Sequence, residues 1–235
     1  MLTMTGLTKT YRTDTVETTA LDCVDLDIAD GEFVAIMGPS GCGKSTLLNV
    51  MGMLDSSTSG SYVFNGQEVA GLSESQLADT RKANIGFIFQ SFNLVDELTV
   101  RENVELALLY HGHSGSERKS RVDRVLDKVG IAHRAKHRPT QLSGGQQQRV
   151  AVARALVGEP KLILADEPTG NLDTATGEEI MAAFASIWKQ GNTVILVTHE
   201  ADIAAHARRI VRMRDGKIES DVVNPTRQAA TPSPR

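Results

Sequence analysis

The most informative segment of the chain reads Gly38-Pro39-Ser40-Gly41-Cys42-Gly43-Lys44-Ser45-Thr46 and matches the phosphate-binding pattern G-x-x-x-x-G-K-[ST]. Its glycines permit backbone angles that place consecutive N–H groups around an anion. Lys44 adds a positive charge for the β- and γ-phosphates of a nucleotide, and the Ser45 hydroxyl is a ligand for Mg²⁺. The segment therefore predicts a binding site for nucleotide phosphates.

The residues on either side of this loop agree with that prediction. Residues 32–37 form an apolar run typical of a buried strand, and residues 46–51 have the pattern of a helix. The N-terminus of a helix favours a phosphate, because its N–H groups lack partners and its dipole is positive there. The alternative is a chance glycine-rich turn, which the strand-loop-helix context disfavours.

Length and composition are those of a globular protein. The chain has 235 residues, enough for one large α/β domain or a core with a subdomain. Its 25 basic and 29 acidic residues give a formal net charge of −4, which does not suggest a nucleic-acid partner. No apolar run is long enough to cross a membrane and no signal-peptide pattern is visible, so we expect a cytoplasmic protein. Two cysteines, Cys23 and Cys42, do not make a disulfide scaffold.

The pattern along the rest of the chain predicts an α/β core with a helical insert. Strands are expected at residues 21–28, 61–64, 67–69, 85–90, 162–165 and 193–198, and helices at 73–82 and 174–189. Capping boxes begin at Ser73 and Thr99. Residues 91 to about 156 are mainly helical in pattern. We expect one domain over residues 1–223 that contains this helical subdomain, and a disordered tail over residues 224–235.

Two adjacent carboxylates, Asp166 and Glu167, follow the apolar strand at residues 162–165. Phosphate sites in such folds lie at the carboxyl ends of strands. Asp166 there can hold Mg²⁺, mostly through water, and Glu167 can face the γ-phosphate and orient a water molecule. The alternative is a solvated pair of carboxylates leaving a strand. The phosphate loop in the same chain favours the functional interpretation.

A second glycine-rich segment, Leu142-Ser143-Gly144-Gly145-Gln146, precedes a helix expected at residues 147–156. Serine and glycine at the N-terminus of a helix again suit an anion. A chain does not usually need two such sites for one nucleotide. The alternative is a glycine-rich linker.

Together these motifs resemble the ATP-binding subunits of the ABC (ATP-binding cassette) transporters. The resemblance rests on Leu-Ser-Gly-Gly-Gln-Gln-Gln-Arg-Val at residues 142–150, followed by Leu-Ala-Asp-Glu-Pro-Thr at residues 164–169, and runs from about Leu2 to Ser220. It implies an α/β fold with a P-loop nucleotidase (ABC ATPase) core and mixed sheet, an antiparallel β subdomain and a helical insert. It also implies ATP and Mg²⁺ as cofactors, and hydrolysis of ATP to ADP and phosphate coupled to transport.

The resemblance implies roles for individual residues. Tyr11 is similar to the aromatic residue that stacks on adenine, and Gln90 to the glutamine that reaches Mg²⁺ and senses a membrane partner. Residues 171–173, Asn-Leu-Asp, match a loop that crosses a dimer interface. His199 matches a histidine that contacts the γ-phosphate. The alternatives are one exposed tyrosine near a terminus and a structural histidine.

Catalysis is expected to combine these groups. Glu167 would act as the base for the attacking water, which His199 positions, while Mg²⁺ is held by Ser45 with Gln90 and Asp166 nearby. Because no obvious arginine finger is present, the γ-phosphate needs further stabilisation. We expect it from the second glycine-rich segment of another copy of the chain, through Ser143, Gly144, Gly145 and Gln146.

Three longer stretches resemble the branch of lipoprotein-releasing (LolD-type) and macrolide-efflux (MacB-type) ATPases. They are Ala-Asp-Glu-Pro-Thr-Gly-Asn-Leu-Asp at residues 165–173, Ile-Phe-Gln-Ser-Phe-Asn-Leu at 88–94 and Leu-Thr-Val-Arg-Glu-Asn-Val at 98–104. One departure is visible. The branch commonly has Leu-Asp-x-Pro-Thr-Ser-Gly, and residues 54–60 carry Ser57 in place of the proline. The change lies in a turn and leaves the ATP chemistry untouched.

The resemblance implies two partners: a second copy of the chain, arranged head to tail, and a membrane permease subunit. Phe92, Leu94 and Val95 are apolar residues in a segment with the pattern of a loop. We expect the segment that begins at Phe92 and ends at Glu97 to receive a short cytoplasmic helix of the permease. The alternative is that these apolar residues cap the core of the helical insert.

The expected location is the cytoplasmic face of the inner membrane, as a peripheral subunit without a transmembrane segment of its own. We expect the subunit to drive export, lipoprotein release or mechanotransmission. An importer subunit is one alternative, which the branch motifs disfavour. A soluble ABC protein that acts on ribosomes or DNA is another. Such proteins usually carry two cassettes or a long coiled-coil insertion, and this sequence has one cassette and no heptad run.

Overall fold

The computed structural model describes residues 1–13 and 15–224. The chain divides into two compact units. The first is built from Met1–Arg81 together with the chain from Thr193 onward, and the second is Lys82–Asn192. The helical insert expected at residues 91–156 lies inside the second unit. The expected organisation as one domain over residues 1–223 stays a prediction.

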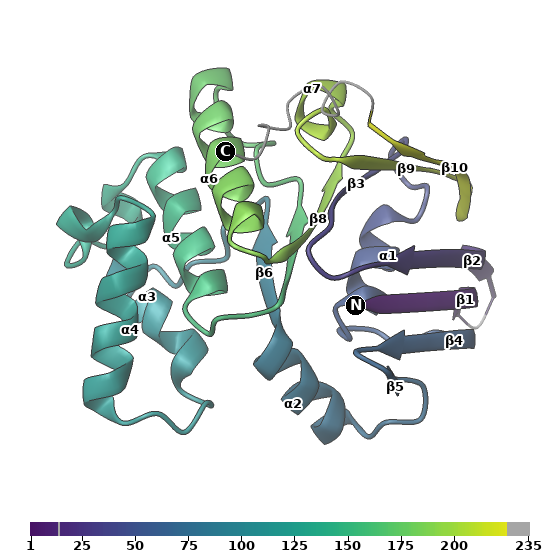
Figure 1. The fold of residues 1–235 in the computed structure, drawn as a ribbon, viewed down its shortest axis with the longest axis horizontal. Coiled ribbons are helices and arrows are strands. Elements are labelled where there is room, and N and C mark those ends of the chain that lie inside the picture. Colours follow the sequence, from purple (N-terminus) through teal and green to yellow (C-terminus); the bar gives the residue numbers. More distant parts are fainter. Residues whose placement is uncertain (14, 225–235) are drawn as a thin grey trace, which may run out of the picture. The chain divides into compact units, whose positions relative to one another are not determined.

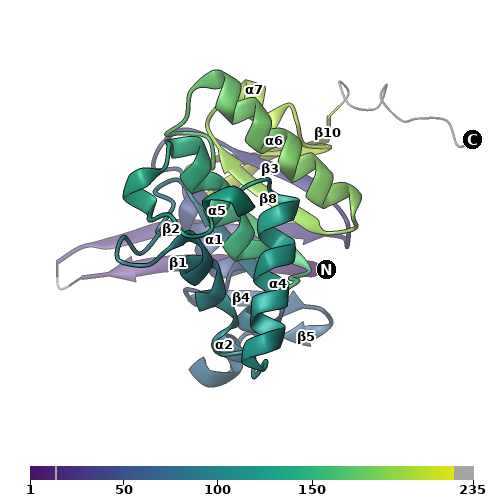
Figure 2. The same cartoon turned by 90° about the vertical axis from the view of Figure 1, so that its left-hand side faces the viewer.

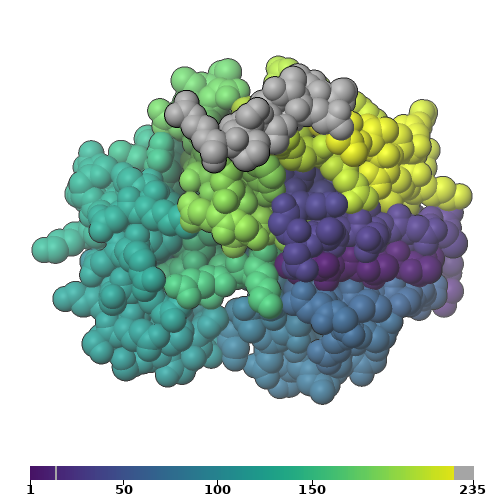
Figure 3. All heavy atoms as spheres, viewed as in Figure 1, coloured from purple at the N-terminus to yellow at the C-terminus, as the bar shows by residue number. Residues whose placement is uncertain are grey.

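An antiparallel sheet forms one part of the first unit. Its strands lie in the order β2-β1-β4-β5 (Figure 1), with the bounds Glu17–Ile28, Leu2–Arg12, Ser59–Phe64 and Gln67–Glu68. Figure 3 shows β1 and β4 as neighbouring purple and blue bands on one face. The hairpin of β4 and β5, expected from the sequence, is confirmed. Asn65 and Gly66 form its turn with φ angles of 49° and 80°, which a two-residue hairpin turn requires.

A mixed sheet in the same unit carries the phosphate-loop strand. Its strands lie in the order β10-β9-β3-β8. Strand β3 (Phe33–Met37) is parallel to β8 (Thr193–Thr198) and to β9 (Arg209–Arg214), whereas β10 (Lys217–Val223) is antiparallel to β9. All residues of β3 and β8 are buried. A parallel strand that is covered on both faces has no solvent side, which explains why both strands have mainly apolar sequences. Helices α1 (Lys44–Met51) and α7 (Ala201–Ala204) contact β8.

The end of the described chain corrects one boundary. Asn224 was expected to open a disordered tail, but its side chain is only 3% exposed. Its Nδ2 donates hydrogen bonds to the carbonyl oxygens of Ala205 and Ala207, at 3.0 and 2.8 Å. The Asn224 amide thus supplies hydrogen-bond donors to carbonyl oxygens that follow α7. Residue composition alone does not predict this contact. The rest of the expected tail, residues 225–235, lies outside the described residues.

The second unit contains a parallel strand pair and a group of helices. Helix α2 (Glu74–Asn84) begins in the first unit and leads into β6 (Ile85–Phe89), which pairs with β7 (Leu162–Asp166), and α6 (Thr174–Lys189) comes after β7 in the chain. Helices α3 (Val100–Glu105), α4 (Gly115–Lys128) and α5 (Gly144–Leu156) contact one another, and Figure 2 shows α4 beside α5. Short 3₁₀ turns lie at Leu106–Leu108, Ala132–Arg134 and Pro139–Gln141. Within residues 1–13 and 15–224, no helix is long and apolar enough to span a membrane.

A buried amide fixes the loop that follows β6. Asn103, in α3, has no exposed surface. Its Oδ1 accepts the Val95 N–H at 2.8 Å, and its Nδ2 donates to the carbonyls of Val95, Leu98 and Thr99 at 3.0 to 3.1 Å. Buried backbone groups without partners are costly, so this one side chain stabilises the path of residues 95–99.

Candidate functional site

The phosphate loop of residues 38–46 connects β3 to α1 and is packed tightly against its own unit. A Cβ atom on Gly38 would lie 2.3 Å from the carbonyl oxygen of Met213 in β9. A Cβ atom on Gly43 would lie 2.4 Å from the carbonyl oxygen of Ala20 in β2. Gly43 also has a φ of 102° and forms the N-cap of α1. The loop backbone therefore approaches two strands more closely than any side chain would permit.

Lys44 is held inside this loop. Its side chain is buried, and Nζ donates to the carbonyl oxygens of Gly38 and Pro39, each at 2.8 Å. A buried ammonium needs such partners because an unpaired charge is expensive to remove from water. The Sγ atom of Cys42, also buried, lies 4.0 Å from Nζ. The positive charge is thus fixed within the loop that the sequence assigns to phosphate.

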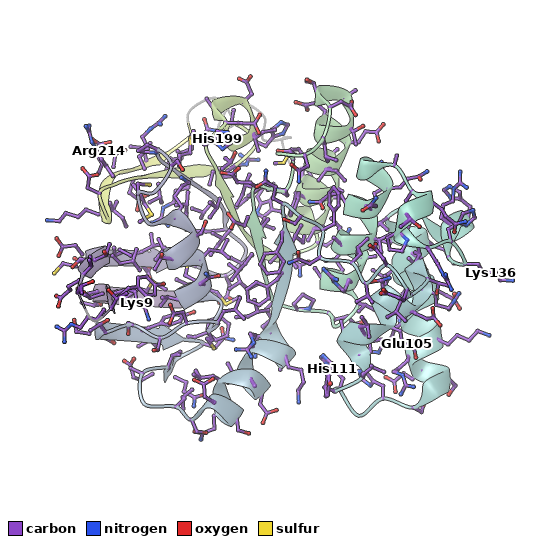
Figure 4. The ribbon with its side chains drawn as sticks, turned by 180° about the vertical axis from the view of Figure 1, so that it is seen from behind. Lys9, Glu105, His111, Lys136, His199 and Arg214 are labelled. Atoms are coloured by element: carbon purple, nitrogen blue, oxygen red, sulfur yellow. The ribbon has the colours of Figure 1, made fainter. Side chains whose placement is uncertain are left out.

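Tyr11 belongs to a polar cluster with Lys9 and Asp55, which we call the Tyr11 cluster. The Tyr11 hydroxyl donates to Asp55 Oδ2 at 2.8 Å, and Lys9 Nζ lies 2.6 Å from Asp55 Oδ1. Burial raises the pKa of Asp55, but hydrogen bonds from Lys9 and Tyr11 outweigh it, and the net pKa lies below its ordinary value. Figure 4 marks Lys9 on its strand. Sequence reasoning missed Lys9 and Asp55, although Asp55 stands in residues 54–60, the stretch that departs from the branch pattern.

His199 follows β8 directly and is exposed (Figure 4). The chain turns after the strand, where the Glu200 N–H donates to Thr198 Oγ1 at 3.1 Å. Met37 and Thr198 are paired at the ends of the parallel strands β3 and β8. The carboxyl edge of this sheet therefore carries both the start of the phosphate loop and His199, the edge at which ligands of such folds bind.

In the second unit, β7 ends at Asp166 and the backbone turns sharply at Glu167. Glu167 is half-buried and has a φ of 44°, a conformation that residues other than glycine adopt at a cost. Its carbonyl oxygen accepts the Gly170 N–H at 3.1 Å. The fully buried Gln148 of α5 donates from Nε2 to the Pro168 carbonyl oxygen at 2.6 Å. Gln148, which the sequence analysis did not single out, thus fixes the backbone next to Glu167.

Gln90 lies beside the loop of residues 171–173. Its Nε2 donates to Asn171 Oδ1 at 3.4 Å, and Asn171 Nδ2 donates back to the Gln90 carbonyl oxygen at 3.0 Å. A Cβ on Gly170 would lie 2.7 Å from Gln90 Nε2. Asp173 ends this loop as the N-cap of α6, and hydrogen bonds from Thr176 lower its pKa. Two motifs that are far apart in the sequence are therefore in contact.

The second glycine-rich segment begins its helix earlier than expected. Helix α5 starts at Gly144 rather than at residue 147, with Ser143 as its N-cap and a capping box to Gln146. The N–H groups of the first turn of a helix have no partners in the helix, so this start places the two glycines among them. A Cβ on Gly145 would lie 2.2 Å from Thr176 Cγ2, so close packing on α6 also requires glycine there.

Helix α5 also anchors the loop after Gln90. Arg154 donates from Nη2 to the Phe92 carbonyl oxygen at 2.8 Å and from Nη1 to that of Asn93. Phe92 and Asn93 have positive φ angles of 59° and 51°, so their carbonyls turn toward the guanidinium. Burial lowers the pKa of Arg154. Sequence reasoning gave no signal for this contact, which links the second glycine-rich segment to the loop of residues 92–97.

Comparison with known proteins agrees with this geometry. The family model for ABC transporters matches residues 21–170. An ABC transporter ATP-binding protein of Bacillus subtilis, YknY, is 49% identical over 218 residues, which cover 93% of this chain and 95% of that protein. The macrolide export ATP-binding/permease protein MacB of Azoarcus is 47% identical over 221 residues, 94% of this chain but 34% of MacB. The solved dimer of the ATP-binding cassette MJ0796 with ADP and Pi has a TM-score of 0.88 at 45% identity, covering 95% and 98% of the two chains.

The chain belongs to the ABC transporter family. It is an ATP-binding subunit with an ABC ATPase fold, similar to the MacB-type cassettes. The roles of single residues stay predictions.

Substitution of Gly43 by alanine should weaken ATP binding without unfolding the protein. The new Cβ meets the Ala20 carbonyl, so the loop and its N–H groups must move; we expect about tenfold weaker binding or more. Gly66→Ala is the matched control, because Gly66 has a φ of 80° with open space around its Cβ position. Gly66→Ala should lose about 1–2 kcal/mol of unfolding free energy from the left-handed backbone, and Gly43→Ala should lose more, because its Cβ also meets a backbone carbonyl. Calorimetric titration with ATP and urea unfolding test this, and equal ATP affinities in the two variants would contradict it.

Proposed function

We propose that two copies of this chain bind two ATP molecules head to tail, and that residues 143–146 of each copy contact the nucleotide in the phosphate loop of the other. The proposal is carried by one observation: the chain presents two glycine-containing helix N-termini suited to phosphate, at α1 and at α5. A phosphate loop contacts only one side of a triphosphate. The MJ0796 cassette, which is described as dimeric, supports the arrangement.

In this assembly, each residue has a defined chemical task. Lys44 neutralises charge on the β- and γ-phosphates, and Tyr11 stacks on the adenine ring. Glu167 takes a proton from the water that attacks the γ-phosphorus, and the bond to the bridging oxygen of ADP breaks. His199 contacts the γ-phosphate and positions the attacking water. The strained backbone of Glu167 supports its role, because such strain clusters at functional sites.

Mg²⁺ fits the oxygen donors that the chain offers. Ser45 supplies a hydroxyl, Gln90 an amide oxygen and Asp166 a carboxylate, and Mg²⁺ prefers oxygen ligands of this kind. Mg²⁺ is usually held in proteins by one or two carboxylates together with substrate phosphates. When bound, the ion neutralises charge that develops on the transferring phosphate.

We further propose that the subunit works on a membrane permease from the cytoplasmic face of the inner membrane. MacB relatives are named as joint ATP-binding and permease proteins, and this chain matches only 34% of such a protein. The docking segment is proposed at residues 92–97, where Asn103 and Arg154 hold the backbone and Val95 is 40% exposed. An importer subunit and a soluble ABC ATPase remain the alternative functions.

Glu167→Gln should retain ATP binding and lose turnover. Glutamine keeps the size of the side chain but cannot accept the proton, so hydrolysis should fall about 100-fold or more. A dimer with bound ATP should then accumulate on gel filtration with MgATP. Glu74→Gln, an exposed residue in the first turn of α2, is the control and should hydrolyse ATP normally. Unchanged steady-state hydrolysis by Glu167→Gln would falsify the assigned role.

Ser143→Asp and Ser143→Asn distinguish the role of Ser143 as a helix cap from its proposed contact with the nucleotide of the other copy. Both residues cap a helix as well as serine does, so α5 should persist in both. Aspartate adds a negative charge where the partner's γ-phosphate is proposed to lie, and ATPase activity should fall about 100-fold, whereas asparagine should keep it within about tenfold. ATP binding to the isolated monomer should be unchanged in both. Loss of that monomer binding would show that Ser143 does not act in trans.

Leu94→Asp should weaken binding to the permease and abolish transport, while the ATPase activity of the isolated subunit stays largely intact. The reason is that a charge would enter a proposed apolar contact. Val223→Asp is the control, because Val223 is 60% exposed on β10 in the other unit. Cross-linking of cysteines placed at Asn93 or Asp96 to the permease measures the contact directly. A complex that transports without any nucleotide-dependent cross-link would exclude this docking segment.

A further inference from the structure

We propose that Lys9 and Asp55 are positioning residues for nucleotide binding, which hold the ring of Tyr11 in one orientation for the purine base. The inference rests on the proposed contact between Tyr11 and adenine. It adds two residues outside the glycine-rich motifs, and it explains how a ring on an antiparallel strand keeps its place relative to the phosphate loop.

The first observation is that the Tyr11 ring is held at both its hydroxyl and one face. The hydroxyl donates to Asp55 Oδ2 at 2.8 Å, and Lys9 Nζ lies over the ring, 4.8 Å from its centroid. Lys9 and Tyr11 are two residues apart on β1, so their side chains emerge on the same face of the strand. Tyr11 as a residue is still 42% exposed. The ammonium thus covers one face of a ring that belongs to an exposed residue, which suits contact with a planar partner.

The second observation is that the cluster is tied to the turn after α1. Lys9 Nζ donates to Asp55 Oδ1 at 2.6 Å and to the Ser56 carbonyl oxygen at 2.7 Å, and Asp55 Oδ1 also accepts the Ser56 N–H at 2.8 Å. The two charged side chains therefore restrain the backbone at Ser56.

The third observation connects the ring to the phosphate loop. Asp55, which accepts the hydrogen bond from the Tyr11 hydroxyl, also donates its backbone N–H to the carbonyl oxygen of Asn49 in α1, at 3.3 Å. Helix α1 begins at Lys44 of the phosphate loop. Burial and Asp55 raise the pKa of Tyr11, so the hydroxyl stays protonated and can donate to Asp55 at neutral pH. The aromatic ring is thereby tied through Asp55 to the helix that begins in the phosphate loop, which suits one nucleotide with a base and a triphosphate.

Fold stability alone does not account for this arrangement. The ion pair of the buried Lys9 with Asp55 also supports the local fold, because a buried charge needs a partner. An exposed tyrosine, however, needs no fixed orientation in order to fold. Fixing the ring in advance does lower the entropy that a ligand must remove on binding. The cluster is therefore suited to recognition of the base, and it should affect the affinity for ATP rather than the affinity for a phosphate chain.

The test compares MgATP with magnesium tripolyphosphate, which has the phosphates but no base, by calorimetric titration of the full chain. Asp55→Asn and Tyr11→Phe should each weaken ATP binding about threefold to tenfold and leave tripolyphosphate binding unchanged. Tyr11→Leu should weaken ATP binding about tenfold or more, because base stacking is lost. In the Tyr11→Leu background, Asp55→Asn should add no further loss. Glu17→Gln, which breaks an exposed ion pair with Arg12 on the same hairpin, is the control and should change neither affinity.

The outcomes separate this inference from the function on which it rests. If Asp55→Asn weakens tripolyphosphate binding as much as ATP binding, or keeps its full effect in the Tyr11→Leu background, Asp55 does not act through the ring and the inference is wrong. If Asp55→Asn has no effect while Tyr11→Leu weakens only ATP, the inference also fails but the base assignment stands. If Tyr11→Leu leaves ATP binding unchanged, the base assignment itself is overturned. Lys9→Met gives an independent arm, with the loss expected for Asp55→Asn.

Discussion

The close approach of the phosphate loop to two strands is the constraint on which the first unit depends. Gly38 lies against the β9 backbone and Gly43 against the β2 backbone, at distances that exclude a Cβ atom. Because β9 belongs to the mixed sheet and β2 to the antiparallel sheet, the loop is fixed by both sheets of this unit. The direction of its N–H groups is therefore set by the whole unit rather than by the loop alone. The buried Lys44 adds its own hydrogen bonds to the loop carbonyls.

In the second unit, the functional segments lack regular secondary structure, so their main-chain groups need other hydrogen-bond partners. Three side chains of helices α3 and α5 hold these segments by direct hydrogen bonds to main-chain groups: Asn103, Gln148 and Arg154. Buried main-chain groups must be paired, and long polar side chains can pair them without regular secondary structure. A change in the position of α5 would therefore reach both the backbone next to Glu167 and the loop after Gln90. The helix that begins with Ser143 is in this way mechanically connected to both.

In the nucleotide-binding regions, the buried positive charges are paired with groups close to them. Lys44 donates hydrogen bonds to carbonyl oxygens, and Lys9 donates to Asp55 and to a carbonyl oxygen. Both buried ammonium groups therefore have partners. The lowered pKa of Asp55 means that its charge is retained across the neutral range. Since its folded-state pKa lies below the ordinary value, its contribution to stability is present above that value and is lost as the pH falls.

Local pattern was sufficient for several regular elements but not for strands β1, β9 and β10, which were not predicted. The bounds expected for α6 and β8 agree with the structure, and so do the capping boxes at Ser73 and Thr99. Each of these depends on residues within a few positions of one another, which is the range that periodicity and capping rules describe. The start of α5 was misplaced by three residues, because glycine disfavours a helix in isolation while the Ser143 cap and contact with Thr176 favour one here.

Contacts between distant parts of the chain were decided only by the tertiary structure. Tyr11 meets Asp55, Gln90 meets Asn171, and Gln148 reaches Pro168, and in no case does one residue's sequence neighbourhood identify the other. Asn224 likewise opens a stretch whose composition is typical of a disordered tail, but Asn224 itself is buried against the end of α7. The sequence determined which chemical groups are present and which segments can bind phosphate. Their pairing depends on how sheets and helices pack, because the partners of a polar side chain are set by distance in space, which the order of residues does not encode locally.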